Sequence, residues 1–138
     1  MKPIDFAKAA GLGGAALALN LALLFVLVFL YAQIIAPGQP EAFYAAAAPR
    51  IGVWSAPIAG ISLLFLAALL FGLRRPARNA YLFALSVFVS YVVIDMAMGL
   101  AMAPIGELFT PPFLFALGGG LIASLAGAWL ATKGRSAA

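Results

Sequence analysis

The chain of 138 residues is too apolar to be a soluble globular domain, since 66% of its residues are hydrophobic, 9% are charged and the mean hydropathy is +1.13. It contains no Cys and no His, which removes the usual ligands of zinc, haem and iron–sulfur clusters and the commonest general base. The net charge of +4 is not accompanied by any basic nucleic-acid-binding fold. The composition therefore predicts an integral membrane protein in contact with lipids, with no metal, no cofactor and no nucleic-acid partner.

Long gaps between charged residues predict the membrane crossings. About 20 apolar residues cross a hydrocarbon core roughly 30 Å thick. Because backbone amides in lipid must be paired within the segment, these runs are expected to be helices, whereas barrel strands would alternate in stretches of about ten residues. We predict one domain, residues 1–138, with an all-α fold: a four-transmembrane-helix bundle with spans at approximately residues 13–35, 53–73, 80–103 and 113–131.

The first span follows Lys2 and Lys8, as the apolar core of a secretory signal would. Its apolar run is longer than a normal signal core, and no good small-x-small cleavage site precedes Pro37. We therefore expect the first span to be an uncleaved membrane anchor.

The outer connection between the first two spans, residues 36–52, is predicted to contain a short interfacial helix at residues 40–48. This Ala-rich segment begins with a proline and is expected to end before Pro49. Phe43 and Tyr44 are then available to rest at the lipid surface. The pattern fits either a plain connector, which we favour, or a lid.

The positions of the basic residues predict the orientation, because Lys and Arg are retained on the cytoplasmic side. In a model with four spans, only Arg50 falls on the outer side. We expect the protein in the inner membrane of a bacterial cell, with both termini in the cytoplasm. We also expect the arginines of the turn between the second and third spans to contact lipid head groups. Those arginines are Arg74, Arg75 and Arg78.

The third span carries a single charge, Asp95. A charged Asp at the centre of a helix costs about 2.5–3.5 kcal/mol on insertion scales, so such a residue points to function by default. Tyr91 lies one helical turn earlier and shares its face, which is expected to point into the bundle. Counting 1.5 Å per residue from the predicted span ends puts Asp95 near the depth of Tyr31 and the glycines at 118–120, and far from Asn20. We predict a mostly protonated Asp95 that donates to Tyr31 or to a carbonyl of the glycine run, or exchanges a proton with a water-filled cleft.

Small residues recur along the fourth span in two adjacent rows. Such a face lets helix backbones approach closely, which drives helix association in lipid. We expect most of this face to pack within the bundle, with a homodimer or a larger complex as the alternative. The face consists of Gly119, Ala123, Gly127 and Ala131, with Gly120 and Ser124 beside them.

Two function classes fit these features. In the first, which the sequence favours, the protein is a non-catalytic accessory, assembly or scaffold subunit that packs against itself or a larger membrane complex, and Asp95 forms a structural hydrogen bond. In the alternative, it is a small proton- or ion-coupled oligomeric transporter that uses Asp95. An enzyme is least expected, because Glu41 and Glu107 fall on outer loops, and Glu107 is roughly 18 Å from Asp95 along a helix unless the third span breaks near Pro104.

Overall fold

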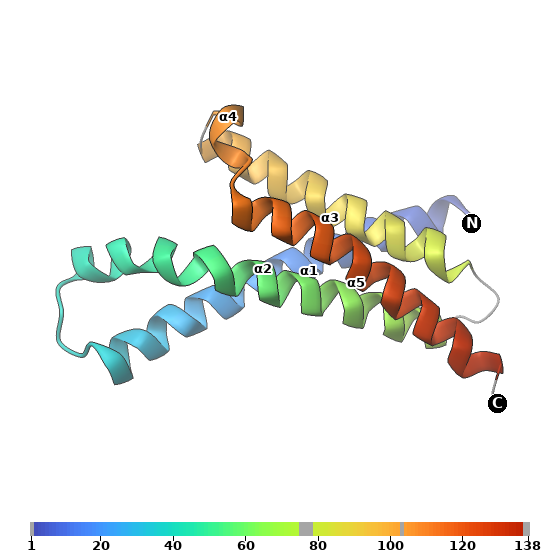
Figure 1. Ribbon diagram of the computed structural model, residues 1–138, viewed down its shortest axis with the longest axis horizontal. Helices are drawn as coiled ribbons and strands as arrows, with labels where there is room; N and C mark the ends of the chain where they lie inside the picture. The colour runs from blue at the N-terminus through green and yellow to red at the C-terminus, as the bar shows by residue number, and fades with distance from the viewer. Residues whose placement is uncertain (1, 75–78, 103, 137–138) are drawn as a thin grey trace.

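The computed structural model describes residues 2–74, 79–102 and 104–136, and the regular structure in these ranges is helical (Figure 1). Four helices are long and apolar enough to cross a membrane. The chain is therefore a multi-pass membrane protein built as an all-α bundle, as the sequence predicts. In chain order the elements are α1 (Pro3–Leu30), the π-helical turn η1 (Tyr31–Ile35), α2 (Glu41–Arg74), α3 (Ala80–Met102), α4 (Ile105–Leu108) and α5 (Pro111–Ser136).

The helix of the first span begins well before the apolar run that predicts it. Pro3 occupies the first helical position, and the backbone N–H of Lys2 donates to the Asp5 carboxylate at 2.8 Å. Together α1 and η1 cover 33 residues, or ~50 Å. This length exceeds the hydrocarbon thickness. The gap between charges predicted only the part of the helix that lies in lipid, and the helix continues beyond it.

The expected short interfacial helix at residues 40–48 is not a separate element. Residues 41–48 form the first turns of α2, which continues through Pro49 and Pro57 to Arg74. The prediction that the helix ends before Pro49 was wrong because an interior proline costs one backbone hydrogen bond and a local bend, and membrane helices tolerate both. The connection between the first two helices is thus shorter than the predicted outer loop at residues 36–52.

The short loop between η1 and α2 is closed by one side chain. The Tyr44 hydroxyl donates to the carbonyl oxygen of Ala36 at 2.7 Å and accepts from the backbone N–H of Gln39 at 3.0 Å. Gly38 has a φ of 77°, a left-handed conformation in which a glycine costs least. The two helices therefore form one closed hairpin.

In the second hairpin, α3 and α5 each begin at a residue whose side chain caps the helix. The Asn79 side chain accepts from the backbone N–H of Leu82 at 3.0 Å and so caps the start of α3. α5 begins earlier than the predicted span, with Pro111 at its first position and Thr110 before it; the Thr110 hydroxyl accepts a long hydrogen bond of 3.4 Å from the N–H of Phe113. Between α3 and α5 lies the short helix α4, which follows the end of α3 at Met102.

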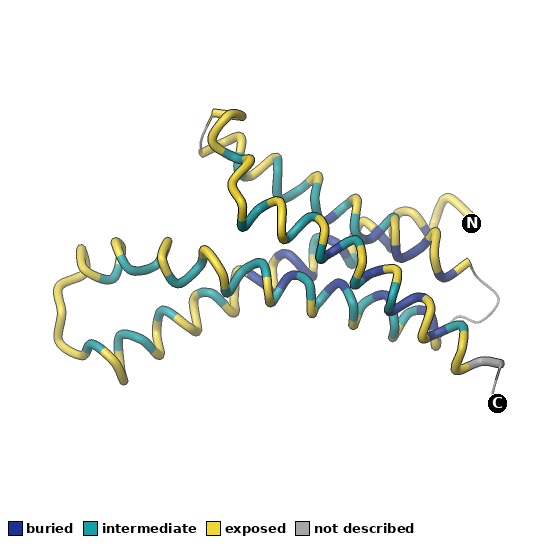
Figure 2. Tube along the Cα trace, viewed as in Figure 1, coloured by how far each residue is buried: buried dark blue, intermediate teal, exposed yellow. Residues whose placement is uncertain are grey.

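The four long helices pack as a ring in the order α1, α2, α5, α3, with α2 also touching α3 across the middle. Buried residues are concentrated in the half of the bundle that carries both chain ends (Figure 2). There the rings of Phe71 and Phe83 stack with their centroids 3.4 Å apart. This half therefore contains most of the buried core of the bundle.

The two hairpins diverge at the other end of the molecule (Figure 1). Gly13 packs against α3 so closely that an added Cβ would lie 2.8 Å from the carbonyl oxygen of Val87 and 2.9 Å from the backbone nitrogen of Tyr91. Residue 13 of α1 is thus level with about residue 89 of α3, and the hairpin of α1 and α2 extends beyond α3 by roughly nine residues, ~14 Å. The bundle is therefore open on this side.

Candidate functional site

Three helices meet at one buried amide side chain. Asn20 of α1 donates from Nδ2 to the Tyr91 hydroxyl of α3 at 2.7 Å and to the carbonyl oxygen of Ala56 in α2 at 3.0 Å. Gly60 makes room for this junction, since a Cβ there would lie 2.7 Å from the Tyr91 hydroxyl oxygen and 3.2 Å from Nδ2. The junction joins α1, α2 and α3 at the point where the hairpins begin to separate.

The other end of the Asn20 amide is unsatisfied. A backbone carbonyl only accepts, so the contact with Ala56 fixes the nitrogen of the amide on that side and leaves Oδ1 as the free atom. Asn20 is 6% exposed, and Oδ1 has no hydrogen-bond partner. An unsatisfied buried acceptor costs about 1–3 kcal/mol, so a group that can donate to Oδ1 is stabilised there.

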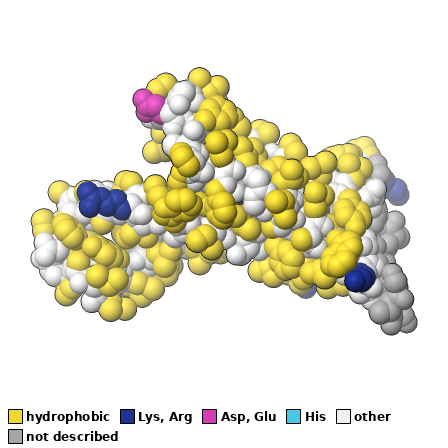
Figure 3. All heavy atoms as spheres, in the orientation of Figure 1, with side chains coloured by type: hydrophobic (Ala, Val, Ile, Leu, Met, Phe, Trp, Pro, Cys, Tyr) yellow, Lys and Arg dark blue, Asp and Glu magenta, His cyan; other side chains and the backbone are white. Residues whose placement is uncertain are grey.

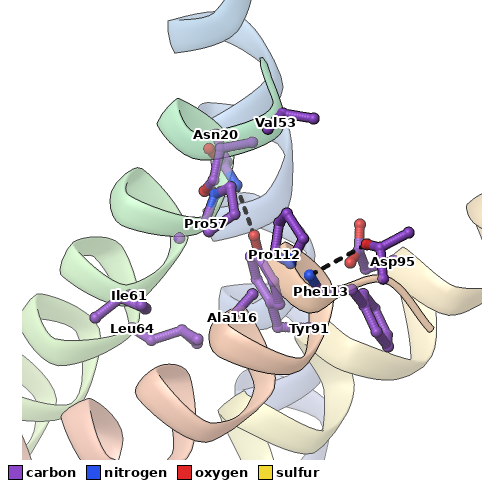
Figure 4. Close-up of a pocket in the computed structure, with 13 residues that line it drawn as sticks. Asn20, Val53, Pro57, Ile61, Leu64, Tyr91, Asp95, Pro112, Phe113 and Ala116 are labelled. Carbon is purple, nitrogen blue, oxygen red and sulfur yellow. Dashed lines mark hydrogen bonds between the residues drawn. The ribbon is translucent and has the colours of Figure 1, made fainter. Parts of the chain in front are cut away.

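Asn20, Tyr91 and Asp95 line one cavity of about 230 Å³ (Figure 4). Asp95 lies one turn after Tyr91 on α3, and in Figure 4 Asn20 and Asp95 lie on opposite sides of the Tyr91 ring. Within the part of the chain that the structure describes, no hydrogen bond or ion pair reaches the Asp95 carboxyl group. The remaining lining residues are Val53, Ala56, Pro57, Gly60, Ile61, Leu64, Thr110, Pro112, Phe113 and Ala116.

A second hollow adjoins the first at Asp95. Asp95, Thr110 and Phe113 line both spaces, and Glu107 and Leu108 of α4 line the second. Glu107 and Leu108 reach this hollow because α3 ends at Met102 and α4 folds back. Leu108 then packs over Gly99, where an added Cβ would lie 2.9 Å from Leu108 Cδ2. The estimate of roughly 18 Å between Asp95 and Glu107 holds only for a continuous helix, and the chain does break near Pro104.

Of the predicted polar set, the structure brings together Tyr91 and Asp95 but not Tyr31. The Tyr31 ring stacks on that of Phe43 with centroids 6.4 Å apart, and both line a separate hollow with Arg50. The depth estimate aligned residue 13 with residue 80, whereas the close contact at Gly13 shifts α1 by about nine residues, ~13 Å, relative to α3. Asn20, which that estimate set apart from Asp95, therefore lines the same cavity, and Tyr31 lies beyond it.

The small-residue face of α5 lies inside the bundle. A Cβ on Gly127 would lie 2.5 Å from the carbonyl oxygen of Phe65 in α2, and one on Gly119 would lie 2.5 Å from Ile61 Cδ1. The face is therefore used within the chain, against α2, as expected. Of its members, Gly119 and Ala123 are half-buried, and the others are buried: Gly120, Ser124, Gly127 and Ala131.

The predicted lipid-contacting arginines are described only in part. Arg74 is exposed and ends α2 at the end of the bundle where the chain termini lie. Arg75 and Arg78 fall outside the described residues.

Sequence reasoning missed the contributions of Asn20, Val53 and Thr110 to the site. Three signals point to them. Asn20 and Gln33 are the two amides inside a predicted span, and Asn20 lies nearer its middle. Pro57 has no N–H to donate to the carbonyl of Val53 one turn earlier. Thr110 precedes a proline, which marks a helix start.

Comparison with protein-family models, with curated proteins and with solved structures gives no match for this chain. Function is therefore inferred from the geometry of the cavity.

Proposed function

We propose that this protein is a small membrane carrier that binds a cation or a proton at Asp95 and moves it between the cavity and the aqueous phase. The observation that carries the proposal is the Asp95 carboxyl group, which lies within a membrane-spanning helix and lines two adjoining hollows. Acids within membrane spans are rare and typically mark ion or substrate pathways. The proposal assigns the protein no catalytic role.

The same geometry weakens the reading in which Asp95 is a structural hydrogen-bonding group. In a scaffold, an acid at this depth would be expected to bond across helices, a contact worth about 0.6 kcal/mol on average. Here the interhelical bonds are made by Asn20, Tyr91 and Ala56, and the Asp95 carboxyl group is left to the cavity. The structural role is thus filled without Asp95.

The proposed setting is a bacterial inner membrane with both termini in the cytoplasm. It is supported by the described basic residues, because Lys2, Lys8, Arg74 and Lys133 lie toward the end of the bundle with the termini and Arg50 lies toward the other end. It is also supported by the apolar surface between the two ends (Figure 3). In this orientation the opening between the hairpins faces outward.

A second candidate is an accessory or assembly subunit that packs against itself or a larger membrane complex. It is supported by the part of the α1 and α2 hairpin that extends ~14 Å beyond α3. Phe29, Ile34 and Ile35 on this extension are 62%, 73% and 71% exposed. An apolar extension of this kind suits a contact with another membrane protein or with lipid.

The experiment that separates the candidates measures charge movement in proteoliposomes on a solid-supported membrane. A jump in proton or Na⁺ concentration is expected to give a transient current with the native chain and with the matched control Glu41→Gln, which changes an acid outside the cavity. Asp95→Asn, which keeps the shape but removes the charge, is expected to abolish it. A native chain without current, or equal currents from Asp95→Asn, would contradict the carrier proposal.

A further inference from the structure

We propose that the hollow between η1 and the first turns of α2 binds the phosphodiester group of an anionic phospholipid, in the leaflet at the end of the bundle opposite the chain termini. The hollow has a volume of about 410 Å³ and is lined by Tyr31, Phe43, Ala46, Ala47, Arg50 and Ile51. None of these residues lines the Asp95 cavity, so this site is independent of the carrier proposal.

The hollow lies at the depth of lipid head groups. It belongs to the part of the α1 and α2 hairpin that projects beyond the other long helices (Figure 1). Arg50 and Arg74 are 24 residues apart on the continuous helix α2, or ~36 Å along it. That distance is greater than the hydrocarbon core, roughly 30 Å, and smaller than the whole bilayer, roughly 40–45 Å. With Arg74 at the head groups of one leaflet, Arg50 is therefore at the head groups of the other.

Arg50 brings a positive charge without a countercharge to this hollow. No acid lines it, and no carboxylate in the described part of the chain forms an ion pair with Arg50. The only acid on α2 is Glu41, nine residues earlier, or ~14 Å along the helix. A guanidinium group can donate to two oxygens of one phosphate, and its single charge matches the single charge of a phosphodiester.

The aromatic side of the hollow is fixed by contacts within the hairpin. The rings of Tyr31 and Phe43 stack with their planes 13° apart. Tyr44 meets the Phe43 ring edge-on at 5.7 Å and closes the loop through its hydrogen bonds to Ala36 and Gln39. The Tyr31 hydroxyl has no hydrogen-bond partner among the residues that the structure describes, so it is available to donate to a phosphate oxygen.

The π-helical turn η1 begins at the same tyrosine. Its wider turn is closed by the N–H of Ala36, which donates to the carbonyl oxygen of Tyr31 at 3.0 Å. Such turns are rare and are frequently found at functional sites. The local departure from α-helical geometry thus coincides with a residue that lines the hollow.

An apolar stripe on α2 favours a lipid over a soluble phosphate as the ligand. Val53, Trp54 and Ile58 follow Arg50 at spacings that place them on its face of the helix, and all three are exposed. The stripe runs from the head-group level toward the middle of the membrane. An acyl chain can therefore lie along it while its phosphate group is held at Arg50, whereas a soluble phosphate gains nothing from it.

The test compares how strongly two brominated lipids quench the fluorescence of Trp54, one turn from Arg50. The chain has two tryptophans, so Trp129→Phe, at an exposed position, leaves Trp54 as the only reporter. This full-length chain is reconstituted in phosphatidylcholine vesicles that contain a small fraction of lipid brominated near the head of its acyl chains. The brominated lipid carries either a phosphatidylglycerol or a phosphatidylcholine head group. We expect an association constant about fivefold higher for phosphatidylglycerol, the effect of one cation on an anionic lipid.

Three variants in this background separate a built site from general attraction to charge. Arg50→Gln is expected to abolish the preference for phosphatidylglycerol. Arg50→Lys keeps the charge but loses the two-point geometry of the guanidinium group, so it is expected to lower the preference. Arg74→Gln, on the same helix at the other end, is the matched control and is expected to leave the preference unchanged.

Equal quenching by the two brominated lipids in the chain with Arg50 intact would overturn the proposal, and this comparison does not depend on the folding of any Arg50 variant. An undiminished preference in Arg50→Gln or Arg50→Lys would also overturn it, because the attraction would then need no shaped site at Arg50. Glycerol 3-phosphate added at constant ionic strength is expected to leave the quenching unchanged. Loss of the preference on its addition would assign the hollow to a soluble phosphate instead of a lipid.

Discussion

Asn20 and Asp95 show two ways in which a polar side chain is accommodated in a membrane bundle. Asn20 uses both amide hydrogens to bind α2 and α3, and so contributes to holding the helices together. Asp95 has no such partner among the described residues and instead lines the two hollows. The residue that joins the helices and the acid that lines the cavity are thus different.

Replacing Gly60 by Ala tests the junction at the level of one methyl group. The added Cβ would lie 2.7 Å from the Tyr91 hydroxyl oxygen, so the Asn20–Tyr91 pair must shift. We expect a loss of about 1–3 kcal/mol in stability, as for overpacking. Thermal unfolding in detergent gives the change.

The control for this prediction is Gly52→Ala on the same helix, where the nearest atoms are Leu24 methyl groups at 3.4 Å, an ordinary contact. The cost of Gly60→Ala is expected to shrink in a Tyr91→Phe background, which removes the clashing oxygen. An equal cost in both backgrounds would show that the hydroxyl group is not what Gly60 accommodates.

Among the elements, α5 lacks bulky side chains at its contact with α2, and α2 lacks backbone N–H groups at two prolines. α5 carries no bulky side chain at Gly119 and Gly127, so it lies directly against the backbone and side chains of α2. α2 lacks two N–H donors, at Pro49 and Pro57. The missing side chains allow α2 and α5 to pack closely, and the missing donors leave two carbonyl groups of α2 without their usual intrahelical partner.

Gly127→Ala tests the tight contact between these two helices. Its Cβ would lie 2.5 Å from the carbonyl oxygen of Phe65, and a backbone atom cannot turn aside as a side chain can. We expect the helices to be forced apart at a cost of about 1–3 kcal/mol, again read from thermal unfolding.

Gly118→Ala is the matched control on the same helix, because no atom lies within 4 Å of the position of its added Cβ. It is expected to leave the unfolding temperature unchanged or to raise it slightly, since Ala favours a helix over Gly. Similar losses at Gly118 and Gly127 would argue against close packing of α5 on α2.

At the scale of the whole molecule, a packed half and an open half are joined by continuous helices (Figure 2). Both chain ends lie at the packed end, and the loop between η1 and α2 lies at the other (Figure 1). Because the chain crosses the membrane an even number of times, both ends must lie on the same side. The proposed orientation then places the cavity toward the outer side.

Cysteine labelling tests this arrangement, because the chain has no native Cys to interfere. Lys2→Cys and Lys133→Cys are expected to react with a membrane-impermeant maleimide only from the cytoplasmic side, and Gln39→Cys only from the outer side. Labelling of intact cells and of inverted vesicles gives the two readings. Reaction of the two end positions from different sides would refute the arrangement.

The sequence by itself determined the class of the protein, the number of helices long enough to cross a membrane and the position of one acid, Asp95, inside the third of them. These follow from local rules: lipid requires long apolar helices, and an isolated acid within one is costly. The small face of α5 was also readable, because its spacing is a property of one helix.

Only the tertiary structure decided which polar residues meet. That depends on how far one helix slides along another, which is set by close contacts such as Gly13 against α3 and Gly127 against α2. All four long helices have a high mean hydropathy, which marks them as membrane spans but does not fix how far one slides along another. The sequence therefore named Asp95 but paired it with Tyr31, whereas the packing placed Asn20 across the same cavity.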